Sequence, residues 1–440
     1  MAERAGGVAV IGAGPAGLAA AWSLTESGRR VRLYEARDRA GGGLRTETVA
    51  GAAADVGVQL LSDGYDRTRM LLGRLGLGDR LVALPGRDAV WREGRAHGLR
   101  YGSVTSLASS SALPTALKLR LGLRYLPFLE RHAGALDLNA PVRAAAAGLD
   151  GESIAEWGRR ELGGEFVELL VYPLLAAYYG VTPEETSAAL FHALAAAGRH
   201  VRVLGIRGGA GPLARDLAEA LVGRGVDLRS GTRVDAVRIG AEGVGVVTAG
   251  EELEHEAAVV AVPPPEAARL VPEAEWLGRI RTRSTATLVL VTDGPTRTGW
   301  FGLSVPRVEA PGDRIAAVCV QEEKGAGLGG PDRGALVVIP SPREGERWAE
   351  QEPRAVLDAT LPAVERLIPG VSDRVRAARL VRLRGGFVPE PGHFDRLAEL
   401  DDAMLPRRLA IAGDYLVTPT VEGAIRSGLA AAGRISRGAA

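Results

Sequence analysis

The stretch that decides the fold lies near the N-terminus and reads Val8-Ala-Val-Ile-Gly-Ala-Gly-Pro-Ala-Gly17. Its apolar part, Val8–Ile11, is typical of a parallel strand covered on both faces, and the glycines that follow have the spacing G-x-G-x-x-G. Residues 18–24 predict a helix, and Val31–Tyr34 predicts a second strand. Glu35 stands at the tip of that strand. Strand, glycines, helix, strand and acid therefore follow one another in the order of a βαβ nucleotide-binding unit.

Each residue type in this unit has a physical role in binding a dinucleotide. Gly12 permits the tight turn, Gly14 lets backbone amides approach a pyrophosphate, and Gly17 lets the helix pack closely on the strand. Unpaired amides and the positive dipole end of the helix, near Ala16, face the phosphates. Glu35 can accept hydrogen bonds from both ribose hydroxyls, which disfavours a 2′-phosphate and hence NADP. We therefore expect a Rossmann-like α/β domain rather than a purely structural glycine turn.

The next segment, residues 35–46, distinguishes between dinucleotides. Its sequence, Glu-Ala-Arg-Asp-Arg-Ala-Gly-Gly-Gly-Leu-Arg-Thr, resembles the signature E-A-x-x-R-x-G-G-[RK]-x-x-T of the flavin amine oxidase superfamily, which includes protoporphyrinogen oxidases and carotenoid desaturases. Gly43 stands where that superfamily has Arg or Lys, so this cofactor contact is either absent or supplied by Arg45. The resemblance implies FAD contacts at Ala36, Arg39, Gly42, Gly43, Leu44 and Arg45.

Three more distant segments carry the same resemblance. Residues 55–60 resemble the stretch that passes alongside the flavin, and residues 232–262 resemble the returning sheet of the FAD domain, in which Val234 meets the adenine through its backbone. Residues 409–428 resemble the segment in which a Gly-Asp pair meets the ribityl-phosphate region. There, a helix opening near Val421 faces the edge of the ring that becomes negative on reduction. The cofactor residues implied are Gly57, Val58, Gln59, Val234, Val262, Gly413, Asp414, Val421, Glu422 and Ala424.

We expect this FAD to be bound non-covalently. Residues 414–427, where some relatives tether the flavin, contain neither cysteine nor histidine. Cys319, the only cysteine, lies in an apolar strand-like run that is typical of an inert buried thiol.

Composition indicates an ordinary globular protein. Of its 440 residues 46% are hydrophobic and 24% charged, and the net charge of +1 gives no electrostatic reason to expect nucleic acid as a partner. The N-terminus enters a strand with no charged leader, and no run approaches the length of a spanning helix, so we predict a cytoplasmic protein. Residues 117–131 mix leucines with cations, which fits either an ordinary lobe helix or a peripheral contact with a membrane.

The FAD segments fall near the beginning, middle and end of the chain, so the cofactor domain should be discontinuous. We expect it to comprise residues 1–85, 205–270 and 385–440. A largely helical subdomain, facing the substrate or a membrane, should occupy 86–204, and a sheet subdomain that binds substrate should occupy 271–384. The glycine-rich residues 325–330 predict a mobile surface turn.

Segments outside the FAD motifs resemble protoporphyrinogen oxidases most closely. They are residues 152–163, 171–187, 208–213, 301–306 and 391–396. The resemblance implies an oxidase that removes hydride from a small organic substrate such as a protoporphyrinogen or coproporphyrinogen.

Alternatives stay open. Residues 420–425 look more like the desaturase and amine oxidase versions of the last helix, so an isoprenoid (carotenoid- or squalene-type) desaturase or an amine oxidase is the second hypothesis. Many amine oxidases place a lysine beside the flavin, and we expect neither Lys118 nor Lys324 there, because Lys324 lies in a glycine-rich turn. A non-enzyme, similar to the escort factors of prenylated proteins, is disfavoured by the retention of Glu35, Arg39 and Asp414.

No residue is named as catalytic, because a flavin can accept a hydride directly from an activated carbon that the protein positions. Four aromatic residues are candidates for the walls of the substrate pocket, with core packing the equal alternative: Tyr178, Tyr179, Phe387 and Tyr415. His393 is expected to be a structural hydrogen-bonding group, and the six histidines show no metal-ligand spacing. The electron acceptor and the oligomeric state are not determined by the sequence.

Overall fold

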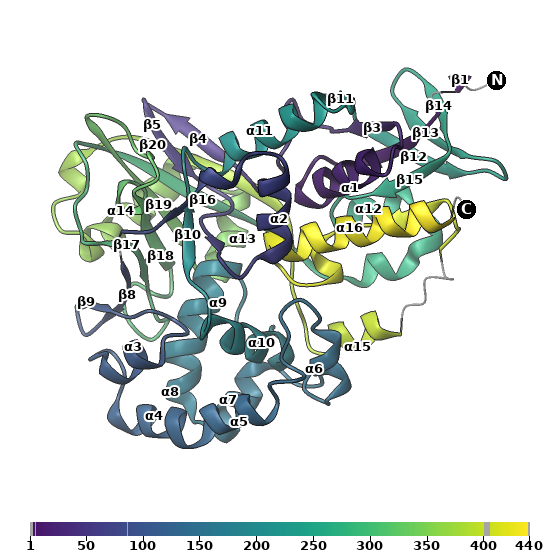
Figure 1. Cartoon of the computed structure of the whole chain (residues 1–440). Helices are drawn as coiled ribbons and strands as arrows, with labels where there is room; N and C mark the ends of the chain where they lie inside the picture. Colours follow the sequence, from purple (N-terminus) through teal and green to yellow (C-terminus); the bar gives the residue numbers. More distant parts are fainter. Residues whose placement is uncertain (1–2, 5, 86, 400–404, 439–440) are drawn as a thin grey trace.

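The computed structural model describes residues 3–4, 6–85, 87–399 and 405–438, and Figure 1 shows them as three adjoining parts. The first is an α/β domain with a parallel sheet, the second is a lobe on a large sheet, and the third is a group of helices. Strands from the beginning, middle and end of the chain share the parallel sheet. The predicted fold class, a discontinuous Rossmann-like domain with a mixed α+β substrate lobe and a helical subdomain, is confirmed.

The sheet of the Rossmann-like domain has five parallel strands in the order β11-β3-β2-β15-β21. Val8 and Val10 belong to the buried cluster on one face, and Ala9 and Ile11 belong to the cluster on the other. Because side chains alternate across a strand, a strand that is apolar throughout needs cover on both faces. The strands are β2 (Val8–Ile11), β3 (Val31–Tyr34), β11 (Asp227–Arg229), β15 (Ala257–Val260) and β21 (Leu409–Ile411).

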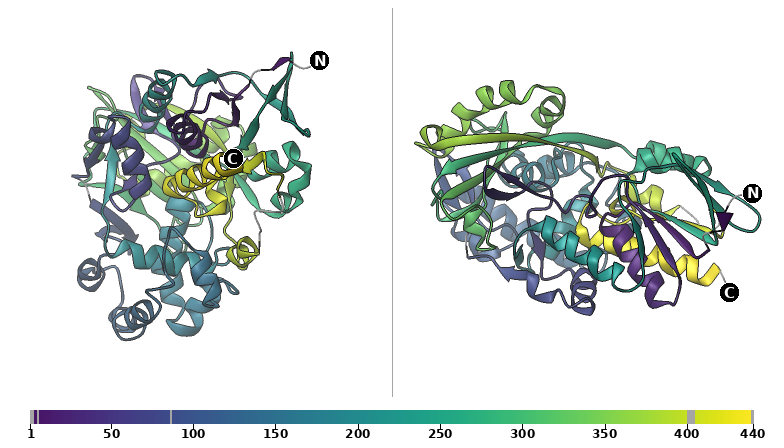
Figure 2. Two further views of the ribbon diagram at one scale, coloured as in Figure 1. Left: turned by 45° about the vertical axis from the view of Figure 1, so that its right-hand side comes forward. Right: turned by 90° about the horizontal axis from the view of Figure 1, so that it is seen from above.

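Three helices cover one face of this sheet: α1 (Pro15–Glu26), α11 (Ala210–Val222) and α16 (Val421–Gly438). Helices α1 and α16 lie side by side in every view (Figures 1 and 2). They pack backbone to backbone, since a Cβ added at Gly428 would lie 2.0 Å from the carbonyl oxygen of Ala16. The other face is covered by a second sheet and a helix: β1 (Glu3–Arg4), β12 (Val234–Ile239), β13 (Val244–Thr248), β14 (Glu252–His255) and α12 (Pro264–Leu270).

The second lobe is built on a seven-stranded sheet in the order β20-β16-β19-β18-β17-β8-β9. Helices α13 (Pro342–Glu350) and α14 (Pro353–Leu367) cover its outer face, where Trp348 and Val364 share a buried cluster with Leu288. Its inner face, which carries Cys319, packs on the hairpin of β4 (Thr46–Val49) and β5 (Ala52–Asp55). The strands are β8 (Arg87–Arg92), β9 (Arg95–Gly98), β16 (Thr282–Asp293), β17 (Trp300–Ser304), β18 (Ile315–Val320), β19 (Arg333–Pro340) and β20 (Val375–Phe387).

The third part is a group of helices around its own apolar core, drawn in blue at the bottom of Figure 1. Residues 115–131 form one helix interrupted by a π-helical turn, with one face in this core and with Leu119 and Leu123 exposed on the other. The main helices are α3 (Val104–Ser109), α4 (Thr115–Arg120), α5 (Leu126–Arg131), α6 (Val142–Ala146), α7 (Ile154–Glu161), α9 (Tyr172–Tyr179) and α10 (Ala188–Gly198). In the described parts of the chain, no helix combines the length and apolarity needed to cross a bilayer.

Two local predictions differ from the structure. Strands β8 and β9 lie in the segment expected to be largely helical, yet β8 pairs with β17 and extends the large sheet. The prediction of a mobile surface turn at residues 325–330 is wrong, because Gly329 bridges to Ala53 and the side chains of Ala326 and Leu328 are buried. Glycine marks this turn because the chain bends tightly beneath β5, with Gly329 at a φ of +81°.

The contact between α1 and α16 gives a test of the fold. We expect Gly428→Val to lower the free energy of unfolding by about 1–3 kcal/mol, because its side chain must push the two helices apart. Gly433→Val is the matched control on the same helix, since a Cβ there meets only the flexible end of Arg437 at 3.3 Å. Urea unfolding measures both, and equal losses would contradict the close packing.

Candidate functional site

The glycine-rich turn after β2 leaves the N-terminus of α1 open to a ligand. Gly12 has a φ of +101°, and a Cβ on Gly17 would lie 1.8 Å from the oxygen of Gly12, so only glycine fits either position. Gly14 precedes the helix and provides no side-chain cap. Glu35 lies beside this turn, and its Oε2 accepts a hydrogen bond from the Ala13 N–H at 2.9 Å. The first-turn amides are therefore free to meet an anion.

The loop of residues 39–43 lies against this turn. The Gly41 N–H donates to the oxygen of Ala13 at 2.8 Å, and a Cβ on Gly42 would lie 3.1 Å from the Cα of Gly14. The half-buried Arg39 has no hydrogen-bond or ion-pair partner among the described residues. Burial and the nearby guanidinium groups of Arg45 and Arg37 lower the pKa of Arg39. An unpaired cation of this kind beside an open helix N-terminus is suited to a pyrophosphate.

Arg45 and Gly43 differ from Arg39. The guanidinium of Arg45 is paired with Glu47 at 2.6 Å and donates to the oxygen of Arg382 at 3.5 Å, so it is engaged by the protein. Gly43 is exposed, with no atom within 4 Å of the position of a Cβ. The missing side chain at Gly43 therefore leaves open space rather than a tight contact.

The segment expected beside the flavin follows β5. A Cβ on Gly57 would lie 2.1 Å from the oxygen of Gly43, and the Val58 N–H donates to that same oxygen at 2.9 Å. The side chain of Gln59 is engaged elsewhere, because its Oε1 accepts from Lys324 Nζ at 2.7 Å and its Nε2 donates to the backbone oxygen of Asp55. Any ligand contact at Gln59 is therefore left to its backbone N–H.

Lys324 lies in an environment that the sequence did not predict. The sequence predicts that it lies in a glycine-rich surface turn, yet its side chain is fully buried and its ammonium contacts Gln59. The prediction of a surface position for Lys324 is therefore wrong. The signal in the sequence was its rarity, since the chain's 54 Lys and Arg residues include only Lys118 and Lys324 as lysines.

The C-terminal segment carries the last predicted cofactor residues. The Gly413 N–H donates to Ser427 Oγ at 3.0 Å, and burial raises the pKa of Asp414 to about 7. The carboxylate of Glu422 is 2% exposed and accepts hydrogen bonds from the Thr68 N–H and hydroxyl, at 2.9 and 2.8 Å. It thus caps the N-terminus of α2 (Asp66–Arg74), and its side chain is not free for a ligand.

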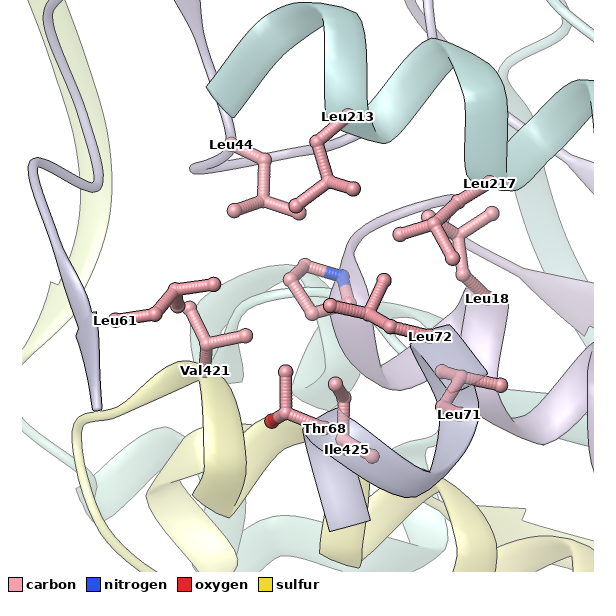
Figure 3. A pocket seen from close by; sticks show the side chains of 11 residues that line it. Leu18, Leu44, Leu61, Thr68, Leu71, Leu72, Leu213, Leu217, Val421 and Ile425 are labelled. Carbon is pink, nitrogen blue, oxygen red and sulfur yellow. The ribbon is translucent and has the colours of Figure 1, made fainter. Parts of the chain in front are cut away.

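Several predicted residues can offer only backbone atoms. The side chains of Leu44 and Val421 face an apolar seam between α1, α2, α11 and α16 (Figure 3), whose volume of about 10 Å³ has room for about one water molecule. Val234 is buried at the start of β12, and the oxygen of Val262 accepts from the Tyr415 hydroxyl at 3.3 Å. The remaining positions lie on the same elements: Ala16 in α1 and Ala424 in α16 are buried, and Ala36 after β3 is exposed.

The four aromatic candidates separate into two pairs. Phe387 and Tyr415 are buried in one core cluster, and the Nε2 of His393 lies 2.8 Å from the backbone oxygen of Tyr415, so both rings pack against the protein core. Tyr178 and Tyr179 end α9, where Tyr178 is 41% exposed and Tyr179 is half-buried. The latter pair therefore remains available to a substrate.

A carboxylate missed by the sequence analysis lies beside Tyr178. The Tyr178 hydroxyl donates to Asp88 Oδ1 at 3.0 Å, and burial raises the pKa of Asp88 to about 7. Asp88 is paired across the sheet with Gly302, which is paired with Cys319, so the three share the inner face of the sheet. The signal in the sequence was an acidic residue directly before the apolar residues 89–91 of this strand.

Cys319 is buried as expected, and burial raises the pKa of its thiol to about 11, which fits an inert thiol. In the described residues, no group of three or more His, Cys, Asp or Glu side chains could hold a metal ion.

The fold and the glycine turn define a protein with a Rossmann-like dinucleotide-binding domain. Comparison with known families identifies it further: the model of the flavin containing amine oxidoreductases matches residues 15–436, and the chain belongs to that family. Membership implies a flavin cofactor and places the chain with the oxidase and protoporphyrinogen oxidase-like proteins that its sequence resembled.

Individual relatives are more distant. A flavin-containing monoamine oxidase of Mycobacterium tuberculosis is 31% identical over 272 residues, which cover 58% of this chain and 57% of that protein. A coproporphyrinogen III oxidase of the same organism is 27% identical over 92% of both chains. The crystal structure of a protoporphyrinogen oxidase from Exiguobacterium superposes with a TM-score of 0.74 at 20% identity, covering 99% of both chains, which supports the shared fold.

The unpaired arginine provides a test of the site. We expect Arg39→Ala to weaken FAD binding about tenfold or more, because a charge-assisted contact to phosphate contributes about 1.5–3 kcal/mol. Arg37→Ala, two residues earlier and exposed, is the control. Fluorescence titration of the flavin-free protein measures both dissociation constants, and equal effects would contradict a specific role for Arg39.

Proposed function

We propose that this protein is an oxidoreductase that binds FAD non-covalently and removes hydride from a small organic substrate. The observation that carries the proposal is the free guanidinium of Arg39 in a loop held against the open N-terminus of α1. Neither feature has a partner within the described protein, and both suit the pyrophosphate of a dinucleotide. The absence of cysteine and histidine from residues 414–427 supports the non-covalent mode.

The residues present fit FAD along its length. We propose that Glu35 accepts hydrogen bonds from the adenosine ribose, that Val234 meets the adenine through its backbone, and that Asp414 meets the ribityl region. The N-terminus of α16 would face the edge of the ring that becomes negative on reduction, which favours the reduced state. Bound FAD would supply a two-electron acceptor, and the protein's part is to position the reacting carbon and exclude water.

A porphyrinogen is the leading substrate. The coproporphyrinogen III oxidase that matches 92% of both chains supports this class, as do the segments that resemble protoporphyrinogen oxidases. We also propose a cytoplasmic location, with peripheral membrane contact through the exposed Leu119 and Leu123 as the alternative to a solvated lobe helix.

The proposal is tested by the colour and bleaching of the protein. Purified protein should be yellow or take up FAD, and anaerobic protoporphyrinogen or coproporphyrinogen should bleach the flavin absorbance. Bleaching by an amine or a carotenoid precursor alone would instead assign one of the alternative substrate classes. A protein without affinity for FAD would refute the proposed function and favour a binding protein of the escort type.

An amine is the second candidate, because Asp88 carries a carboxylate on the inner sheet face next to the exposed ring of Tyr178. A carboxylate beside an aromatic ring attracts an ammonium group and repels the propionates of a porphyrinogen.

This second candidate has its own pH signature. Because the pKa of Asp88 is raised to about 7, its carboxyl is neutral below that pH and ionised above it. For a diamine such as putrescine we expect KM to fall as pH rises from 6 to 8, and Asp88→Asn to raise KM about tenfold at pH 8 and flatten this dependence. For coproporphyrinogen, Asp88→Asn should leave KM unchanged or lower it. Steady-state oxygen consumption separates the two outcomes.

A further inference from the structure

A buried polar cluster joins the segment of residues 57–59 to the substrate sheet. At its centre is Lys324, which follows β18 and is 0% exposed. Its Nζ donates to Gln59 Oε1 at 2.7 Å, to Gln321 Oε1 at 3.1 Å and to the backbone oxygen of Gln59 at 3.2 Å. It also lies 3.5 Å from Asp55 Oδ2, which is itself fully buried.

The cluster requires an ammonium rather than a guanidinium. Four acceptor oxygens converge on one point, which suits the compact charge and three donors of lysine and not the planar fork of arginine. Arginine supplies nearly all the cations of this chain, and Lys118 and Lys324 are the two exceptions. A lysine at a fully buried position in such a composition indicates a specific requirement there.

The two charges of the ion pair face different parts of the protein. Asp55 Oδ1 accepts from Thr46 Oγ1 at 2.6 Å and from the N–H of Ala210, the first residue of α11, at 2.8 Å. The negative end of the ion pair therefore faces the N-terminus of α11, and the positive end lies on Gln59. Because the dielectric constant inside the protein is low, the electrostatic field of this ion pair extends further than it would in water.

Lys324 and its neighbours also fix the conformation of Gln59. The Oε1 of Gln59 accepts from Lys324 and from Gln321 Nε2 at 3.2 Å, and its Nε2 donates to the backbone of Asp55. Its backbone oxygen is held by Lys324 as well. Among the described residues, the N–H groups of Gly57 and Gln59 are left without a partner. These two donors lie on the segment expected beside the flavin.

We propose that Lys324 is a positioning residue for the flavin: it holds Gln59 so that the free N–H groups of residues 57 and 59 meet the ring, and its charge favours the reduced state. Reduction adds negative charge to the ring, and a buried cation on the adjacent segment stabilises that charge. This inference rests on the proposed FAD site. It differs from a direct lysine contact, because Lys324 acts through Gln59.

The test compares Lys324→Met with Lys118→Met, the same substitution at the only other lysine, which lies in α4. FAD affinity is measured by titration of flavin-free protein, and the flavin midpoint potential by equilibration with reference dyes. We expect Lys324→Met to raise the dissociation constant about tenfold and to make the potential more negative, because a charged hydrogen-bonding partner is lost. Lys118→Met should change neither quantity.

A double variant separates this role from a merely structural one. Lys324→Met leaves Asp55 without its ion-pair partner, so loss of folding stability is expected on either interpretation. Lys324→Met with Asp55→Asn removes both charges and should recover much of that stability. Under the proposal its flavin potential stays shifted, whereas a potential and FAD affinity equal to wild type would overturn the proposal. The wild-type titration alone tests the proposed FAD site, so the two failures are distinguishable.

Discussion

The candidate site depends on backbones that approach more closely than side chains would allow. A Cβ would collide with a neighbouring carbonyl oxygen at Gly17, at Gly57 and at Gly428, with separations of 1.8, 2.1 and 2.0 Å. These three contacts join the first turn to α1, residues 57–59 to the loop of residues 39–43, and the last helix to the first. The contact at Gly428 joins the two ends of the chain, and those at Gly17 and Gly57 join segments that are close in sequence. Such close backbone approaches are what an extended ligand bound by several segments would require.

The charged residues of the cofactor motifs differ in whether the protein pairs their charge. Arg45, which belongs to the same motif as Arg39, is paired with Glu47, whereas the half-buried Arg39 has no ion-pair partner among the described residues. A half-buried guanidinium without an ion-pair partner destabilises the ligand-free protein, and a bound anion would offset that destabilisation. Glu422 shows the opposite case. It belongs to a cofactor motif, yet its carboxylate caps α2 and is paired with Arg426 at 2.7 Å.

The Rossmann-like domain was predictable because its signals are local. The strand Val8–Ile11, the helix after it and the strand Val31–Tyr34 were expected from hydrophobic runs and glycine spacing, and the structure places them there. The surroundings of Lys324 and Asp88 were not predictable in that way. Each depends on which strands become neighbours and on which turn folds beneath a hairpin, and no periodicity in the sequence encodes those long-range contacts. The same holds for Phe387 and Tyr415, whose aromatic character fits a pocket wall and a core equally well.

The division of roles between backbone and side chains bears on specificity. At the start of α16, the side chain of Val421 fills the apolar seam and that of Glu422 holds α2, so the helix offers a ligand only its amides. Backbone amides recognise charge and geometry but not the identity of a substrate. We therefore expect discrimination between substrates to come from side chains outside the cofactor motifs, and we propose that these lie on the inner face of the large sheet and at the end of α9. Asp88 and the exposed ring of Tyr178 lie in this region. The family motifs therefore indicate the type of chemistry but not the substrate.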